Sequence, residues 1–131
     1  MARVFLDTTV LIDYLRARPA VHARIEELIA GGDERWACAV NVEEVVRGLH
    51  ERERAAADRL FRGLRVAPLS SREGWLAGDW RREYAQQGVT LSQADCLVAA
   101  AAVSVGARLA TGNPKHFPMP GLTVEHWPAG V

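Results

Sequence analysis

The chain has 131 residues, of which 49% are hydrophobic and 24% charged, and its formal net charge is zero. This length and composition predict one globular domain over residues 1–131, with a substantial core and no room for a second domain. No apolar stretch approaches the roughly eighteen residues of a membrane span, and the amino terminus does not resemble a signal peptide, so we expect a cytoplasmic protein without a membrane partner. A zero net charge gives no strong indication of a nucleic-acid ligand.

The cysteines and histidines do not form a recognisable metal-binding pattern. Cys38 and Cys96 lie far apart in apolar stretches, which favours reduced core thiols over a disulfide framework or a zinc site. None of the four histidines has ligand spacing with these cysteines: His22, His50, His116 and His126.

The first half of the chain alternates between predicted strands and helices. Residues 3–7 (RVFLD) form an apolar run typical of a short buried strand, and residues 10–17 continue as a helix that Pro19 interrupts. Apolar residues at helical spacing predict a helix over 21–29, which the sequence GGD ends. Residues 36–40 (WACAV) form a second predicted strand, and Asn41 then caps a helix that is followed by another over 55–64.

The second half continues the alternation. Residues 66–69 (VAPL) are a third candidate strand, and Ser70 or Ser71 begins a long helix that runs to QQG at 86–88. Ser92 opens a helix that is apolar nearly all round and therefore central to the core. The last strands lie in residues 108–111 and 122–127. Strands alternating with helices predict a mostly parallel sheet covered on both faces, a three-layer α/β domain.

Three carboxylates are expected at one edge of this sheet. Asp7 interrupts the first apolar run, where a charge is costly unless it is paired, hydrogen-bonded or bound to a metal. It falls at the carboxyl end of the first strand, the place where open α/β sheets hold their ligands. Glu44 lies in the first turn of the helix after WACAV, and Asp95 in that of the helix after GVTLS. If the strands before both helices run parallel to the first, all three acids reach the same edge.

Helix capping is an alternative explanation for two of these acids. Asn41-x-x-Glu44 and Ser92-x-x-Asp95 both have capping-box spacing, in which the acid bonds to the backbone N–H of the cap residue and favours the positive helix end. Asp7 alone is equally compatible with a hydrogen-bonded turn at a strand end. Capping and a functional role can coexist, because the second carboxylate oxygen remains free.

Thr111 and Asn113 follow another apolar strand, so four polar positions are expected to converge. Neighbouring carboxylates repel one another and raise each other's pKa unless a cation neutralises them. Oxygen donors without Cys or His favour a hard ion, Mg²⁺ or Mn²⁺. Such ions support phosphodiester hydrolysis by activating a water and orienting the phosphate, and this chemistry requires no histidine as a general base.

Four stretches of the sequence resemble a known family in their order and spacing: FLDTTVLIDYL, VNVEEVVRGL, LSQADCLVAAAA and LATGNPKHFP. Together they are similar to the PIN-domain ribonucleases and, within these, to the VapC-type toxins of prokaryotic toxin–antitoxin pairs. Each stretch is weak alone, but the four cover the chain from end to end. The resemblance implies a three-layer α/β/α PIN-like domain with the activity of a metal-dependent endoribonuclease, which cuts structured RNA such as a tRNA or an rRNA loop.

The resemblance also assigns site residues. It places the metal-binding acids at Asp7, Glu44 and Asp95, with Glu44 preferred to its neighbour Glu43 because the family acid precedes a glycine by four positions. Asn113 completes the predicted catalytic set at a position where many members carry a fourth acid. An Asn there can ligate a metal or hold a water through its carbonyl oxygen, but it adds no charge.

Three further polar residues lie near these positions. Thr9 and Thr111 are expected to orient ligands or waters from behind the metal-binding acids. Asp13, six residues beyond Asp7 and within the helix, is expected to be an exposed or cap-related acid outside the site.

The family further implies a homodimer and a cognate VapB-type antitoxin, whose C-terminal segment lies along a groove near the active site and often inserts a basic side chain there. Four large apolar residues suit the core, the dimer interface or this groove: Trp36, Leu60, Trp75 and Trp80. A modest arginine surplus between Arg47 and Arg65 is compatible with phosphate contacts or with a solvated helix face, the reading that we favour.

Two other classes of protein are alternatives to a ribonuclease toxin. Phosphotransfer domains also place an Asp at a strand end, but Asp7 is followed by Thr8 and Thr9 with no second acid, and Lys115 lacks the acid pair of a receiver domain. The stronger alternative is a catalytically weak PIN-like module that binds RNA or a protein and uses its acids as helix caps.

Overall fold

The computed structural model describes residues 1–130. Strands and helices alternate along the chain, which confirms the α/β organisation expected from the sequence. The elements are β1 (Arg3–Leu6), α1 (Thr8–Leu15), α2 (Pro19–Ala30), β2 (Glu34–Cys38), α3 (Ala39–Arg47), η1 (Glu51–Glu53), α4 (Arg54–Arg62), β3 (Arg65–Ala67), α5 (Ser71–Gln86), α6 (Gln93–Ser104), β4 (Arg108–Thr111), η2 (Pro114–His116) and β5 (Val124–His126).

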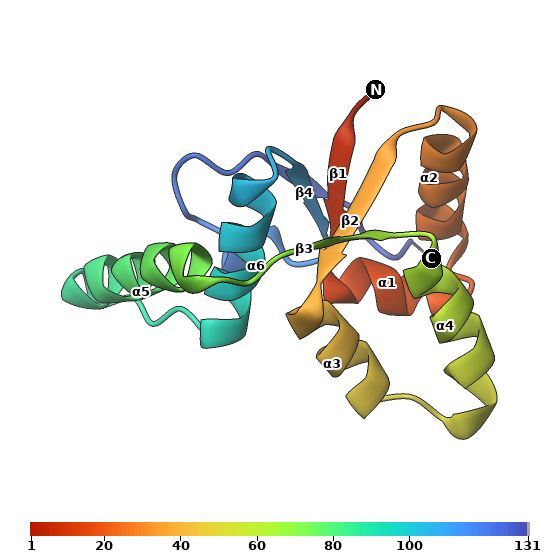
Figure 1. Cartoon of the computed structure of the whole chain (residues 1–131), viewed down its shortest axis with the longest axis horizontal. Coiled ribbons are helices and arrows are strands. Elements are labelled where there is room, and N and C mark those ends of the chain that lie inside the picture. The colour runs from red at the N-terminus through yellow and green to blue at the C-terminus, as the bar shows by residue number, and fades with distance from the viewer. Residues whose placement is uncertain (131) are drawn as a thin grey trace.

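The five strands form one parallel sheet in the order β3-β2-β1-β4-β5. β1 lies at its centre, with Phe5 opposite Trp36 of β2 and Leu109 of β4. The chain adds β2 and β3 on one side of β1 and then β4 and β5 on the other, so the direction of winding reverses at β1 (Figure 1). Ligands of open parallel sheets bind beyond the carboxyl ends of the strands at such a reversal.

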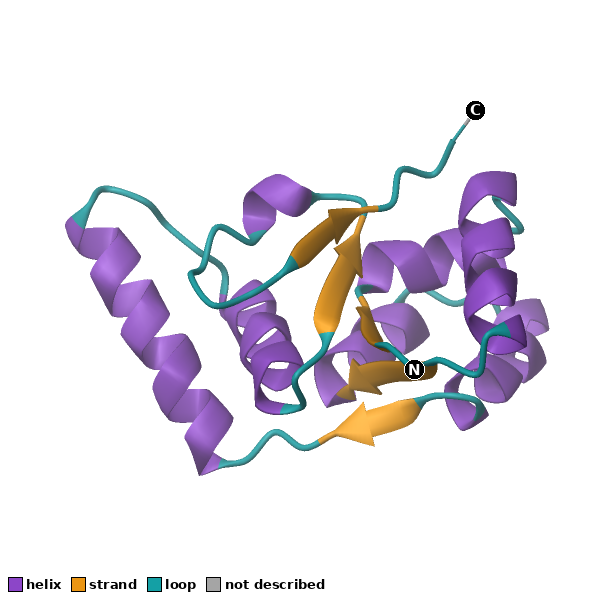
Figure 2. Ribbon diagram, turned by 90° about the horizontal axis from the view of Figure 1, so that it is seen from above, coloured by secondary structure: helices purple, strands orange, loops and turns teal. Residues whose placement is uncertain are grey.

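Helices cover both faces of the sheet (Figure 2). Alternate residues of β1 point to opposite faces, as in any strand. Val4 and Leu6 pack with α1 and α2, and Phe5 packs with residues of α5 and α6. α3 follows the carboxyl end of β2 and contacts both α1 and α6. The predicted three layers are therefore α5 and α6, the sheet, and the group of α1, α2 and α4.

The interior contains the helix that the sequence predicted to be central. The four consecutive alanines of α6 at residues 99–102 are fully buried, and their small side chains allow α6 to pack closely against the sheet and α5. Cys38 and Cys96 are buried free thiols, as expected. None of the helices within residues 1–130 has the length and hydropathy needed to cross a membrane.

The large apolar residues divide among three environments. Trp80 lies in the core with 5% of its surface exposed, whereas Trp75 is 74% exposed on the outer face of α5. Trp36 is half-buried against the core on the α5 side of the sheet, and Leu60 is half-buried on the α1 side.

Two local predictions are wrong. α3 begins at Ala39, so Asn41 is its third residue and not its cap; the Asn41 side chain instead accepts a hydrogen bond from Cys38 N at 2.9 Å. The sequence GVTLS before Asp95 is not a strand, because α5 and α6 pack directly against each other and a loop joins them. Asp95 therefore reaches the sheet edge at the start of α6, which follows α5 without an intervening strand.

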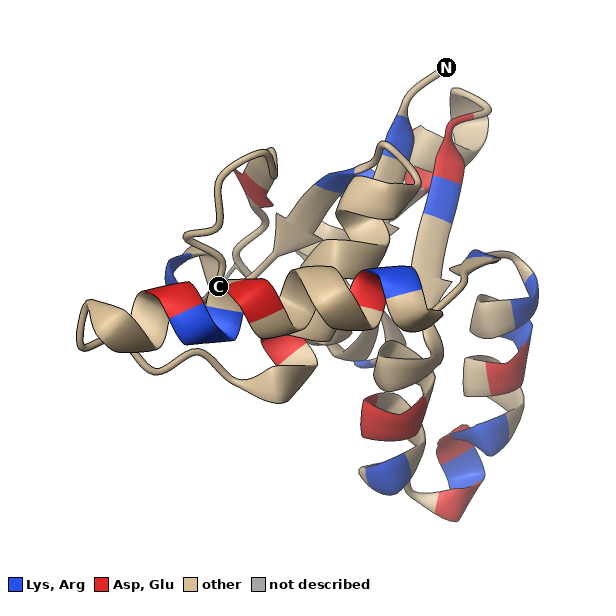
Figure 3. Ribbon diagram, turned by 60° about the vertical axis from the view of Figure 1, so that its left-hand side comes forward, with Lys and Arg blue, Asp and Glu red and all other residues tan. Residues whose placement is uncertain are grey.

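Three of the six arginines from Arg47 to Arg65 pair with an acid three or four positions away. Their partners lie one turn away, which produces the alternating charges along these helices (Figure 3). This agrees with the solvated-face interpretation of the arginine surplus. The pairs are Arg47 with Glu43, Arg54 with Glu51, and Arg62 with Asp58.

Candidate active site

Asp7 stands at the carboxyl end of the central strand. Its backbone N–H donates to Ala110 O at 3.0 Å, which holds it between β1 and β4, and only 7% of its surface is exposed. Carboxylate oxygen Oδ2 accepts hydrogen bonds from Thr111 Oγ1 at 2.7 Å and from Thr9 Oγ1 at 3.3 Å. Asp7 occupies the N-cap position of α1, yet its side chain makes no cap hydrogen bond. Two hydroxyl groups therefore orient this carboxylate.

The same two threonines tie the end of β4 to the start of α1. Thr9 Oγ1 accepts from Gly112 N at 2.9 Å, and Thr111 Oγ1 accepts from Asn113 N at 3.0 Å. A side chain at Gly112 would bring its Cβ to 3.3 Å from Thr9 Oγ1, so glycine permits the close approach. Both threonines thus connect the Asp7 carboxylate to the backbone that follows β4.

Burial raises the pKa of the Asp7 carboxyl above its usual value, and the charge of Asp95 raises it further. The Thr111 hydroxyl, the Thr8 backbone N–H and the Thr9 hydroxyl oppose this effect without cancelling it. An ionised Asp7 is therefore held at an energetic cost beside a second carboxylate. A bound cation would offset both the lost hydration and the repulsion.

Glu44 lies in the second turn of α3 and belongs to a different network. Its Oε1 accepts from Thr8 Oγ1 at 2.7 Å, and Thr8 Oγ1 accepts from Asn41 Nδ2 at 3.1 Å. The capping-box role suggested by Asn41-x-x-Glu44 is therefore wrong, because α3 begins before Asn41. Thr8 and the fully buried Asn41 were not predicted as site residues, although the pair of threonines after Asp7 was visible in the sequence.

Asp95 is the third residue of α6. Ser92 Oγ accepts from Asp95 N at 3.0 Å, which confirms Ser92 as the helix cap. The carboxylate of Asp95 points elsewhere: its Oδ2 lies 3.5 Å from His116 Nδ1. Sequence reasoning missed His116, although it follows Asn113 by three residues in a turn that begins with a proline.

The three acids share one edge of the sheet without forming a finished metal centre. Among residues 1–130, no three acidic, histidine or cysteine side chains are grouped in a way that could hold a metal ion. Asp7 and Asp95 nevertheless interact electrostatically, and their oxygen donors fit a hard divalent cation.

Two other predicted positions lie at the margin of this arrangement. Asn113 is exposed, and its backbone N–H, donating to Thr111 Oγ1, links it to Asp7. Asp13 is half-buried within α1, where its backbone oxygen accepts from Arg18 N at 2.9 Å. It is therefore less exposed than the sequence suggested.

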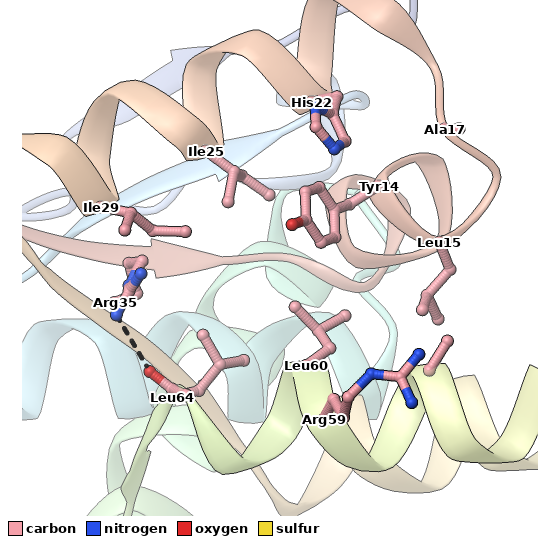
Figure 4. Close-up of a pocket in the computed structure, with 12 residues that line it drawn as sticks. Tyr14, Leu15, Ala17, His22, Ile25, Ile29, Arg35, Arg59, Leu60 and Leu64 are labelled. Atoms are coloured by element: carbon pink, nitrogen blue, oxygen red, sulfur yellow. Dashed lines mark hydrogen bonds between the residues drawn. The ribbon is translucent and has the colours of Figure 1, made fainter.

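A groove of about 350 Å³ lies between α1, α2 and α4 (Figure 4). Tyr14 stacks on His22 at one end, with ring centroids 4.9 Å apart, and the walls include Ile25, Ile29 and Leu60. Arg35 also lines the groove; its Nη2 donates to Gly63 O at 3.3 Å, while its Nε is buried without a hydrogen-bond partner within residues 1–130. The groove is thus mostly apolar, with Arg35 and Arg59 among its lining residues.

Comparisons with known proteins agree with this fold. The PIN domain family model matches residues 4–118. Ribonuclease VapC19 of Mycobacterium tuberculosis is 33% identical over 114 residues, covering 87% of this chain and 91% of the relative. Ribonuclease VapC10 of the same species is 34% identical over 117 residues, covering 88% and 86% of the two chains.

A solved structure shares the fold along nearly the whole chain. The structure of VapBC2 from Rickettsia felis, bound to a DNA fragment from its promoter, superposes with a TM-score of 0.84 at 23% identity, over 95% of this chain and 98% of that one. The family match spans residues 4–118, and the two ribonucleases align with 87% and 88% of this chain. The chain therefore belongs to the PIN-domain family and, within it, to the VapC-type ribonuclease toxins.

Proposed function

We propose that this chain is a single PIN-like domain that acts in the cytoplasm as a metal-dependent endoribonuclease toxin on structured RNA, such as a tRNA or an rRNA loop. The observation that carries the proposal is the buried Asp7 carboxylate, which two threonine hydroxyls orient next to the charge of Asp95. The names of the relatives, both ribonucleases, support the substrate class.

Each polar residue has a role in this proposal. Asp7 and Asp95 would hold Mg²⁺ or Mn²⁺, with Glu44 completing the set. When bound, such a cation activates the attacking water and stabilises the leaving oxygen of the phosphodiester. Thr9 and Thr111 fix the rotamer of Asp7, and the amide of Asn113 can position a water at the rim. In the net reaction, water adds to phosphorus and the bond to one ribose oxygen breaks.

Cleavage of total small RNA tests the proposal. The purified chain, free of its antitoxin, is incubated with Mg²⁺ or Mn²⁺ or with chelator, beside Asp7→Asn and Asp95→Asn. We expect discrete products that require the metal and fall by at least about 100-fold in both variants, because an amide keeps the hydrogen bonds but lacks the charge.

The matched control is Asp13→Asn, which removes a carboxylate from α1 and should cleave at the wild-type rate. Cleavage that survives chelation, or an Asp7→Asn variant as fast as the wild type, would contradict the proposed mechanism. RNA binding without cleavage by a folded chain would favour the alternative of a catalytically weak binding module. The uncharged Asn113 and the absence of a finished three-ligand cluster within residues 1–130 are the observations behind that alternative.

We also propose that a VapB-type antitoxin occupies the groove between α1, α2 and α4. Apolar walls from three helices suit one face of an amphipathic helix. The structural neighbour from Rickettsia felis is a VapBC complex, which supports a partner of this class.

Self-association is assigned to a separate surface. The outer face of α5 carries the exposed Trp75 beside Gly74 and Gly78, followed by Asp79 and Arg82. If two copies of this face pack antiparallel, the indole of one copy can lie over the glycines of the other, and Asp79 can approach Arg82 of the other copy. We propose that the homodimer forms through this face.

A further inference from the structure

Thr8 lies between two of the acids at the carboxyl edge of the sheet. It is the first residue of α1 and directly follows Asp7. Burial raises the pKa of the Asp7 carboxyl, and the backbone N–H of Thr8 is one of the groups that oppose this rise. The Thr8 hydroxyl serves a different acid, because it donates to Glu44 Oε1 at 2.7 Å. One residue therefore interacts with Asp7 through its backbone and with Glu44 through its side chain.

Asn41 fixes the direction of the hydrogen bond from Thr8. Cys38 N donates to Asn41 Oδ1 at 2.9 Å, and because a backbone N–H can only donate, the amide oxygen of Asn41 must face Cys38. Asn41 Nδ2 then faces Thr8 and donates to its Oγ1 at 3.1 Å. The Thr8 oxygen is thus used as an acceptor, which leaves the hydroxyl hydrogen for Glu44. A donor fixed in this way suits an ionised carboxylate, which can only accept.

Helix capping explains only part of this series of hydrogen bonds. Asn41 is the third residue of α3, and its bond to Cys38 N is the one that a capping box makes from that position. A Glu or Gln at this position would complete the box equally well. The bond from Asn41 to Thr8 adds nothing to the cap, so its effect lies in how it orients the hydroxyl.

The charges of Glu44 and Asp7 act on a common neighbour. Burial raises the pKa of the Cys38 thiol, and the charges of both carboxylates raise it further. Glu44 and Asp7 therefore lie within electrostatic reach of the same point at the end of β2, although they belong to different hydrogen-bond networks. Since Thr8 directly follows Asp7, its bond to Glu44 fixes the position of one carboxylate relative to the other.

We infer that Thr8 is a positioning residue for Glu44, and that Asn41 holds the Thr8 hydroxyl in its donating orientation. A Glu side chain has several rotatable bonds, and a hydrogen bond to one carboxylate oxygen restricts them before the substrate binds. The inference rests on the part that Glu44 has in the proposed function, and it adds two residues to the same site.

Thr8→Val tests this role, because it keeps the branched shape of the side chain and the backbone N–H near Asp7 and removes only the hydroxyl. Thr8→Ala is a second variant without the hydroxyl, and Thr8→Ser restores it. Thr123→Val is the matched control, since it makes the same change at an exposed residue directly before β5, at the opposite edge of the sheet. Glu44→Gln is made alone and together with Thr8→Val.

Two measurements are made on each variant. Cleavage rates at limiting and saturating concentrations of one RNA that the wild type cuts in the total-RNA assay separate kcat from KM. NMR of the isotope-labelled, metal-free protein follows the resonance of the Glu44 side-chain carboxyl carbon, which reports on hydrogen bonding to that group independently of activity.

We expect Thr8→Val and Thr8→Ala to lower kcat by roughly ten- to a hundredfold and to leave KM within about twofold, because Glu44 is misplaced and RNA binding is unchanged. Both should shift the Glu44 carboxyl resonance. Thr8→Ser and Thr123→Val should stay within about threefold of the wild-type kcat. Thr8→Val added to Glu44→Gln should cause no further loss, because the group that Thr8 orients is already disabled.

Three other outcomes separate the inference from the proposed function. A folded Thr8→Val variant that cleaves as fast as the wild type would overturn the positioning role and leave the ribonuclease function standing. An unshifted Glu44 resonance, or a further loss of about tenfold when Thr8→Val is added to Glu44→Gln, would also overturn it, because Thr8 would then act independently of Glu44. A folded wild type that cleaves no RNA under any metal condition would overturn the proposed function itself, and the inference with it.

Discussion

Asp7 occupies a helix-capping position, but its side chain does not cap the helix. It occupies the N-cap of α1, where an Asp side chain normally accepts a backbone N–H bond, but its carboxylate is hydrogen-bonded by Thr9 and Thr111 instead. The position near the positive helix end still favours a negative charge. Burial and the charge of Asp95 disfavour that charge, so the ionised Asp7 carboxylate does not add to the stability of the fold.

This balance predicts the effect of Asp7→Asn on stability. The pKa of Asp7 is raised in the fold, so the fold binds this proton more tightly than the unfolded chain does, and stability is lost as the pH rises through the folded pKa. In the presence of chelator at neutral pH, we expect Asp7→Asn to stabilise the protein by about 1 kcal/mol, since it removes the charge and keeps an acceptor for the threonines.

Denaturant unfolding at neutral pH and below pH 4 measures this effect. The gain from Asp7→Asn should shrink at the lower pH, where the wild-type carboxyl is itself protonated, and Asp13→Asn serves as the control. A variant that is less stable than the wild type at neutral pH would mean that the ionised carboxylate supports the fold.

At the scale of elements, the pair formed by α5 and α6 is joined by a buried acid. Glu73 Oε1 accepts from Ser70 N at 2.8 Å and from Ser70 Oγ at 2.7 Å, which completes a capping box at the start of α5. Its Oε2 accepts from Ser104 Oγ at 2.9 Å, at the end of α6. These hydrogen bonds lower the pKa of Glu73 to about 2.

Glu73 should therefore make stability depend on pH. Because its folded pKa lies below the ordinary value of 4.5, its contribution is complete above that value and is lost as the pH falls towards about 2. Glu73→Gln keeps the shape but loses the charge, and we expect it to destabilise the protein by roughly 1–2 kcal/mol at neutral pH.

Unfolding curves across the acid range test this expectation, with the exposed Glu83→Gln of α5 as the control. The stability difference between the wild type and Glu73→Gln should close near pH 2. A constant difference at all pH values would show that packing, and not ionisation, accounts for the loss.

For the whole molecule, the two proposed interfaces lie on opposite sides of the sheet (Figure 1). Ile29, 46% exposed, lines the groove between α1, α2 and α4, and Trp75, 74% exposed, lies on the outer face of α5. We expect Ile29→Glu to weaken antitoxin binding at least about tenfold without changing the mass of the free toxin, because it places a charge in an apolar groove. Trp75→Glu should give a monomer that still binds antitoxin.

Light scattering and calorimetry with the cognate antitoxin measure both properties, and each variant is the control for the other. Both residues are exposed, so neither substitution opens a cavity in the core. A groove variant that binds antitoxin as tightly as the wild type would contradict the antitoxin site, and a Trp75→Glu dimer would contradict the assigned dimer face.

Apart from the strand expected at GVTLS, the sequence by itself determined the order of strands and helices, the central place of the alanine-rich α6, and the positions of Asp7 and Thr111 at strand ends. These features follow from local patterns, because apolar periodicity and the polar residues that end a run depend on neighbours in the chain. Recognition of the four motifs then placed Glu44 and Asp95 with them.

Only the tertiary structure decided how these residues meet. The bond from Thr8 to Glu44, the buried Asn41 and the approach of His116 to Asp95 join segments separated by 21 to 36 positions. It also decided that Asp95 arrives from a helix pair and not from a strand, and that Trp75 faces outward while Trp80 is buried. The physical reason is that side-chain partners and burial depend on how elements pack together, and local propensity does not specify that packing.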